Sequence, residues 1–187
     1  MNDPQTKGDL IERLQRVQQT ISDTVQGLSP AQFVTGTDTA WSAAGYLKHL
    51  ILSIQPIARV VSRSAEQLRR RFGQPDRPAL TYAEVVAAYR KRLDEGVRAE
   101  DYDAVVPSAL LLPDGLENEQ PYLLETWYDL HTKLLGAIEN WNETDLDTCQ
   151  LPHPALGILT IRELLFFTLY HNTLHGRDIE QVSRAFA

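Results

Sequence analysis

Apolar residues near the start of the chain recur at steps of three and four, which is the spacing of a helix that buries one face. The stripe consists of Leu10, Leu14, Val17, Ile21, Val25 and Leu28. It predicts a first helix over roughly 7–28. Ser29 followed by Pro30, a favoured first helical residue, predicts a short further turn of helix that ends near Phe33.

The same periodicity returns later in the chain and predicts more helices. They lie over residues 42–72, from 81 to past 93, over 121–141 and over 160–185. Ser42 is well placed as an N-cap, and residues 81–84 and 160–163 both have the Thr-x-x-Glu spacing of a capping box. These helix starts therefore follow from local side chains as well as from the apolar stripes.

Residues 101–120 break the helical pattern, because two prolines, a glycine and several acids interrupt it. The segment is predicted to be a long loop, of a length that is often functional, lying over an end of the helices. No segment alternates at period two for long. The predicted fold class is all-α, an antiparallel bundle of helices with long connecting loops.

Length and composition fit a single domain over residues 1–187. The chain is 43% hydrophobic and 23% charged, which is ordinary for a globular protein. A chain of this length can bury a full core without disulfides or a metal. Any bound metal is therefore expected to serve function rather than folding.

Charge and cysteine content exclude several function classes. Lysine and arginine number 18 against 25 acids, a formal charge of −7, which argues against nonspecific nucleic-acid binding. No apolar run approaches a membrane span and the N-terminus has no apolar signal region, so a cytoplasmic protein is expected. Cys149 is the single cysteine, so no intrachain disulfide can form, and nothing beside it in the sequence would lower its pKa.

Two histidines four residues apart, His171 and His175, lie within the last predicted helix. The face that they share consists of Leu164, Thr168, His171, His175, Asp178 and Val182. Two imidazoles placed in this way can hold one divalent metal if other helices supply more ligands. The alternative is a pair of exposed or structural core histidines, and the spacing alone favours that alternative.

A metal site needs a third donor, for which His49, His131 and His153 are the candidates. His49 lies one turn past Gly45, whose small size would leave room for an ion or water. A three-histidine set leaves coordination positions open, as catalytic metals require. His131, beside Trp127, is interpreted as a core histidine, and His153 as packing at the start of the last helix.

Three segments of the chain resemble the DinB superfamily of bacterial bundle proteins, also called DinB/YfiT-like metalloenzymes. They are Trp41-Ser-Ala-Ala-Gly-Tyr-Leu-Lys-His49-Leu, His153-Pro-Ala-Leu-Gly-Ile-Leu-Thr160 and Phe167-Thr-Leu-Tyr-His171-Asn-Thr-Leu-His175. The resemblance implies an all-α fold, a four-helix bundle with an additional helix and long connecting loops, in which three histidines meet at one end of the four-helix core. It carries metal ligation onto His49, His171 and His175.

The resemblance also implies a range of activities. Relatives include thiol transferases and isomerases that use small thiols such as bacillithiol or mycothiol, and many relatives have no known activity. The expected protein is thus a homodimeric enzyme that acts on a small molecule, with a low-molecular-weight thiol as substrate or partner. The family name, which comes from DNA-damage induction, implies no DNA binding. The 101–120 segment departs from the most compact members.

The chemistry of the predicted site leaves several possibilities open. Imidazoles suit zinc, nickel or iron as well as copper, so the ligands do not identify the metal. An open site can activate water, as in a hydrolase, or hold a thiol as thiolate, as in a transferase. Asp178 is either a hydrogen-bond acceptor for an imidazole or a surface ion-pair partner. A non-catalytic bundle that mediates association is the remaining alternative.

Overall fold

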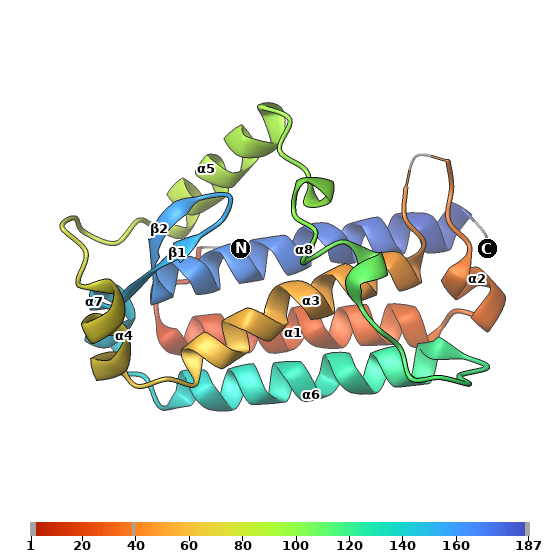
Figure 1. Cartoon of the computed structure of the whole chain (residues 1–187), viewed down its shortest axis with the longest axis horizontal. Helices are drawn as coiled ribbons and strands as arrows, with labels where there is room; N and C mark the ends of the chain where they lie inside the picture. Colours follow the sequence, from red (N-terminus) through yellow and green to blue (C-terminus); the bar gives the residue numbers. More distant parts are fainter. Residues whose placement is uncertain (1–2, 39, 186–187) are drawn as a thin grey trace.

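Four long helices lie side by side in the computed structural model, which describes residues 3–38 and 40–185 (Figure 1). They are α1 (Lys7–Gln26), α3 (Ala43–Val61), α6 (Glu119–Glu139) and α8 (Ile161–Ala185). Around the bundle the order is α1, α6, α3, α8, because each helix packs on the next and α8 packs on α1. The predicted helical-bundle class is therefore confirmed.

The direction of neighbouring helices differs from the prediction of an antiparallel bundle. In Figure 1 the sequence colours show α1 and α8 running one way and α3 and α6 the other. The packed pairs α3–α6 and α1–α8 are therefore parallel. The physical reason is the long connection over 62–118, which carries the chain back along the bundle before α6 begins.

Capping side chains set the starts of several helices. Thr81 and Glu84 exchange hydrogen bonds with each other's backbone N–H ahead of α5 (Tyr82–Asp94). At the start of α8, the Thr160 N–H donates to Glu163 and the Glu163 N–H donates to the Thr160 hydroxyl, at 2.8 and 3.2 Å. Both predicted capping boxes are thus confirmed, and each satisfies backbone donors that a helix start leaves free.

The helix predicted over 42–72 is in fact two helices, α3 and α4 (Ala65–Phe72). Ser64 begins the second one, because its hydroxyl accepts from the Gln67 N–H while the Gln67 side chain accepts from the Ser64 N–H. The apolar stripe of the sequence continues across this break, with Leu68 fully buried, so hydrophobic periodicity gave no sign of it.

Short elements that the sequence pattern did not predict join α6 to α8. They are α7 (Glu143–Thr148) and an antiparallel hairpin of β1 (Gln150–His153) and β2 (Gly157–Thr160). Strands of four residues are too short for period-two alternation to stand out. Gly157, with φ +77°, supplies the left-handed backbone where the second strand begins.

The segment between α5 and α6 runs over the outside of α3 in Figure 1. It contains two short 3₁₀ turns, η1 (Ala99–Asp101) and η2 (Pro107–Ala109), of which η2 packs on α3. α5 itself packs on α8. The predicted long loop therefore lies along one side of the bundle, next to the two helices that carry the candidate histidines.

Buried apolar side chains from all four long helices form the core, which the short element α2 (Pro30–Val34) closes at one end with Phe33. Trp127, on α6, is the largest fully buried side chain. Among the described residues, no helix has both the length and the apolar character needed to cross a membrane.

Candidate metal centre

Three histidines converge between the packed antiparallel helices α3 and α8. His49 comes from α3, and His171 and His175 come from successive turns of α8. One ring nitrogen of each lies within 4.8 Å of the others. The Nε2 atoms of His49 and His171 are 3.0 Å apart. Two ligands of one tetrahedral zinc ion would lie about 3.3 Å apart, given Zn–N bonds of roughly 2.0–2.1 Å.

The outer nitrogen of His49 is held by the connection that crosses α3. The Nδ1–H of His49 donates to the Val105 carbonyl over 2.8 Å, which leaves Nε2 without a proton and directed at the cluster. The ring is 3% exposed. Burial, together with a smaller effect of the nearby His175, lowers the pKa of His49 to about 4. His49 is therefore neutral, the form that binds metal.

Asp178 holds the outer nitrogen of His175 in the same way. Its Oδ2 accepts a hydrogen bond from Nδ1 of His175 over 2.8 Å, one turn along the same helix. Of the two roles predicted for Asp178, the geometry shows the hydrogen-bond acceptor for an imidazole. A carboxylate behind a ligating imidazole fixes its tautomer and raises its basicity. Nε2 of His175 is thus left free to bind a metal.

His171 is buried and lies close to both other histidines. It is 5% exposed, and its ring centroid lies 5.0 Å from that of His49 and 4.6 Å from that of His175. Burial is the main reason why its pKa falls well below the ordinary value, with its two neighbours adding to the effect. Positive charge on His49 or His171 is disfavoured, whereas a divalent ion would be bound by one nitrogen of each of the three rings.

The donor set therefore fits a divalent metal ion. Three neutral imidazoles suit zinc, nickel, iron or copper, and a set of three leaves coordination positions for a substrate or water. The sequence prediction of His49, His171 and His175 as one set agrees with their positions in the structure. That they bind a metal remains a prediction.

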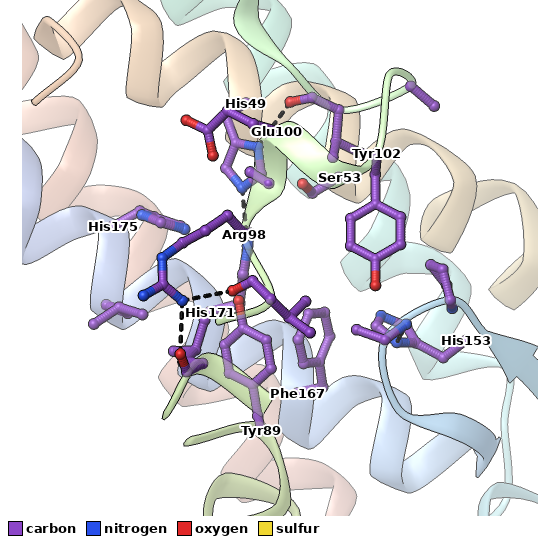
Figure 2. Close-up of a pocket in the computed structure, with 18 of the residues that line it drawn as sticks. His49, Ser53, Tyr89, Arg98, Glu100, Tyr102, His153, Phe167, His171 and His175 are labelled. Atoms are coloured by element: carbon purple, nitrogen blue, oxygen red, sulfur yellow. Dashed lines mark hydrogen bonds between the residues drawn. The ribbon is translucent and has the colours of Figure 1, made fainter. Parts of the chain in front are cut away.

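The three histidines lie in the wall of a pocket of about 990 Å³, part of which Figure 2 shows. Its other walls come from α3, α5, the hairpin and residues 97–105 of the connection before α6. That last wall is what sequence reasoning missed, beyond placing a long loop near the bundle. The pattern of polar and apolar residues in 97–105 carries no periodic signal that would have identified it.

The sequence suggested that Gly45 would leave room for an ion or water, but Trp41 occupies that space. A Cβ atom at this position would meet the Cβ of Trp41 at 2.9 Å, so the glycine exists to let Trp41 approach α3. The Trp41 ring lies 5.3 Å from the His49 ring, and Tyr46 stacks on His175 at 5.6 Å. Trp41 and Tyr46 both line the pocket.

His131 and Cys149 lie away from the cluster, in the core. His131 is 1% exposed and packs on Trp127, with ring centroids 3.9 Å apart, which confirms its interpretation as a core histidine. Cys149 is fully buried, its thiol faces the Ala65 carbonyl, and burial raises its pKa. A raised pKa removes the thiolate that a nucleophilic cysteine needs.

His153 packs against the last helix, as the sequence suggested, and has a second property that the sequence did not indicate. It ends strand β1 and packs on Phe167 of α8, at 4.4 Å between ring centroids, as the packing interpretation requires. It also lines the pocket, opposite the three-histidine cluster in Figure 2. Sequence reasoning missed this second property because the hairpin that positions His153 was not predicted.

Comparisons with known proteins agree with this geometry. The structure is similar to YfiT from Bacillus subtilis, described as a probable metal-dependent hydrolase with an unusual four-helix bundle topology. The TM-score is 0.64 at 15% identity, over 100% of this chain and 92% of that one, a likeness of fold. A search of curated proteins gave no match. The family model of the DinB superfamily matches residues 13–179, nearly the whole chain, and the chain therefore belongs to the DinB superfamily.

Proposed function

We propose that this chain is a divalent-metal-dependent enzyme that acts on a small molecule, with S-transfer from a low-molecular-weight thiol as its leading reaction. One observation carries the proposal: three imidazoles from two helices, those of His49 and His171 buried, converge at the wall of a large pocket. A closed structural site would have four protein ligands and no pocket beside it. Here open positions and space for a substrate occur together.

A bound ion would supply Lewis acidity, which lowers the pKa of a thiol or water molecule that ligates it. The chain supplies orientation, through the Val105 carbonyl behind His49 and the Asp178 carboxylate behind His175. In the transfer, the thiol loses its proton to solvent and its sulfur forms a bond to an electrophilic carbon. The bond from that carbon to its leaving group breaks, and the leaving group departs with the bonding electrons.

The thiol would have to come from a substrate. No cysteine lines the pocket among the described residues, and the single cysteine, Cys149, is buried elsewhere with a raised pKa. The pocket is lined mainly by apolar side chains, among them Phe167, Leu164 and Leu174. A largely apolar wall excludes water that would compete with a thiolate.

Metal-dependent hydrolysis is the second candidate. It is favoured by the description of YfiT and by a carboxylate in the pocket, Glu100, which Figure 2 shows near His49. Glu100 is exposed. Its carboxylate is not engaged by a histidine of the cluster, whereas that of Asp178 accepts a hydrogen bond from His175. It is therefore available to accept a proton from an attacking water.

The test begins with elemental analysis of protein purified without an affinity tag, before and after reconstitution with zinc, nickel or iron. We expect one ion per chain, and thiol-dependent turnover across a panel of electrophiles that the double change of His171 and His175 to Ala abolishes. Failure to bind metal stoichiometrically would overturn the proposal. Thiol-independent cleavage of esters or amides would support hydrolysis instead. Metal binding without turnover on either panel would favour a non-catalytic bundle.

A homodimer and a cytoplasmic location stay predictions. Light scattering at micromolar concentration tests the dimer, which would pair through one helix face with two-fold symmetry.

A further inference from the structure

The pocket has a second polar end, on the side away from the three histidines. Figure 2 shows His153 and Tyr102 there, with Ser53 between them and His49. All three line the pocket. His153 is brought to it by the hairpin and Tyr102 by the residue that follows η1, so two separate connections of the fold meet at this place.

The hydrogen bonds around His153 fix which of its nitrogens carries the proton. Nδ1 faces its own turn, where the N–H groups of Ala155 and Leu156 both point at it over 3.3 Å. An N–H donor requires an acceptor, so Nδ1 is unprotonated in this arrangement. Burial lowers the pKa of His153 to about 4, so the ring is neutral near pH 7. The single ring proton is therefore on Nε2.

Both donors at this end of the pocket are free to bind a ligand. Within residues 3–38 and 40–185, neither Nε2 of His153 nor the hydroxyl of Tyr102 has a hydrogen-bond partner. In Figure 2 the Tyr102 hydroxyl points to the side of the pocket where His153 lies. Two neutral donors that approach one region suit an oxygen with two lone pairs.

Phe167 separates the two ends of the pocket. Its ring centroid lies 4.4 Å from that of His153 and 5.2 Å from that of His171. The ring of Phe167 thus separates the imidazole of His171, at the metal end, from the imidazole of His153. A ligand that reaches both ends needs an apolar middle to lie on Phe167, and a polar group at each terminus.

We propose that His153 Nε2–H and the Tyr102 hydroxyl form a subsite that binds a carbonyl or carboxylate oxygen of the substrate. The metal end would then hold the reacting group and the His153 end would hold the far end of the same molecule. Only the first half of this arrangement rests on the proposed function, because the donors of the subsite exist without a metal. His153 is thus a substrate-positioning residue rather than a metal ligand.

The first test measures the proton on His153 in the full-length protein by ¹⁵N NMR of the histidine rings at pH 7. We expect a protonated Nε2 and an unprotonated Nδ1 for His153, with and without zinc. A proton on Nδ1, or a doubly protonated ring, would overturn the subsite. A failure to bind zinc would contradict the proposed function and leave this measurement unchanged, so the two failures are distinguishable.

The second test measures binding of three six-carbon probes by chemical-shift titration of the zinc-loaded protein. Hexanamide offers a neutral carbonyl, hexanoate a carboxylate, and hexylammonium no acceptor. We expect hexanamide or hexanoate to bind at least about fivefold more tightly than hexylammonium, as one to two hydrogen bonds provide, with shifts at Phe167 and His153. Whichever of the two acceptors binds more tightly identifies the end group. Equal binding of all three would overturn the proposal.

Two variants each remove one of the proposed donors while keeping the local structure. His153→Asn keeps an oxygen that accepts from the turn N–H groups and removes the Nε2 donor. Tyr102→Phe removes only the hydroxyl. Each is expected to lower the affinity for the preferred acceptor probe by about threefold to tenfold and to leave hexylammonium binding and zinc affinity unchanged. Unchanged acceptor affinity in both variants would refute the subsite. If His153→Asn fails to fold, Tyr102→Phe and the ring-proton measurement still decide.

Discussion

Histidines lie on both sides of α8, and the two sides differ in what the ring nitrogens face. On one side, Asn172 of α8 meets His131 of α6, and both nitrogens of the His131 ring are engaged, with the Trp127 carbonyl at 3.2 Å and the Asn172 amide at 3.3 Å. On the other side, His171 and His175 turn their inner nitrogens toward His49. Both sides are buried, yet only the second has converging lone pairs.

The difference shows that burial by itself does not make a metal site. Burial lowers the pKa of His131 and of His49 to about 4 alike. His131 is a satisfied core residue because its donor and its acceptor face matched partners on α6 and α8. In the cluster, the outer partners Val105 and Asp178 engage Nδ1 of His49 and His175, so the Nε2 lone pairs of these two rings are available on the inner side, next to His171. A cation there would be bound by all three rings.

The largest expected effect comes from removing one ligand of the cluster. Structural zinc sites with four ligands bind with about 10–16 kcal/mol, so His171→Ala should lose about 4 kcal/mol, or roughly 1,000-fold in zinc affinity. His49→Ala and His175→Ala should behave alike. Competition titration with a chelator of known affinity measures the change, with circular dichroism as the check on folding.

The matched controls are the other histidines. His131→Ala and His153→Ala should leave zinc affinity nearly unchanged, because neither ring belongs to the cluster. A loss for His131→Ala as large as that for His49→Ala would mean that the two sides of α8 are not distinct, and that the site has four ligands or is misassigned.

The next largest effect concerns folding, and here the core histidine His131 should matter more than the cluster histidine His171. His131→Ala should lower the free energy of unfolding by about 3 kcal/mol, because it opens a cavity beside Trp127 and leaves the Asn172 amide without its acceptor. His171→Ala in metal-free protein should cost less, because His171 lines the pocket and its removal enlarges an existing opening instead of creating a new cavity in the core. Urea unfolding with chelator present measures both. A smaller loss for His131→Ala than for His171→Ala would contradict this account.

The smallest effect is a pH dependence assigned to His131. Its pKa is about 4 in the folded protein, below the 6.5 of an unperturbed histidine, so below pH 6.5 the unfolded chain binds a proton that the folded chain does not. Stability therefore falls as the pH drops from 6.5 toward 4, and this histidine accounts for about 2 kcal/mol of the loss at pH 5.

His131→Gln cannot take up this proton, so its unfolding free energy should fall by about 2 kcal/mol less than that of the wild type between pH 7 and pH 5. Urea unfolding at both pH values, with chelator, gives the comparison. His49, His153 and His171 contribute to the acid sensitivity of both proteins, so the difference isolates His131. Identical pH dependence in the two proteins would show that His131 is not held neutral by the fold.

The sequence by itself determined the local features. The apolar stripes predicted the four long helices, and the Thr-x-x-Glu pairs predicted the starts of α5 and α8, because helix formation and capping depend on residues within four positions of one another. The shared face of His171 and His175 followed from the same geometry. His49 joined them only through the family resemblance, since periodicity did not distinguish it from His131.

The tertiary structure alone decided the features that depend on distant residues. The parallel pairing of α3 with α6, the Val105 carbonyl behind His49 and the pocket wall of residues 97–105 all arise where segments far apart in the chain pack together. The hairpin that brings His153 into the pocket belongs to the same group. Periodicity and capping report contacts within a helix, whereas the pocket consists of contacts between elements, and for that physical reason it could not be derived from the pattern of the sequence.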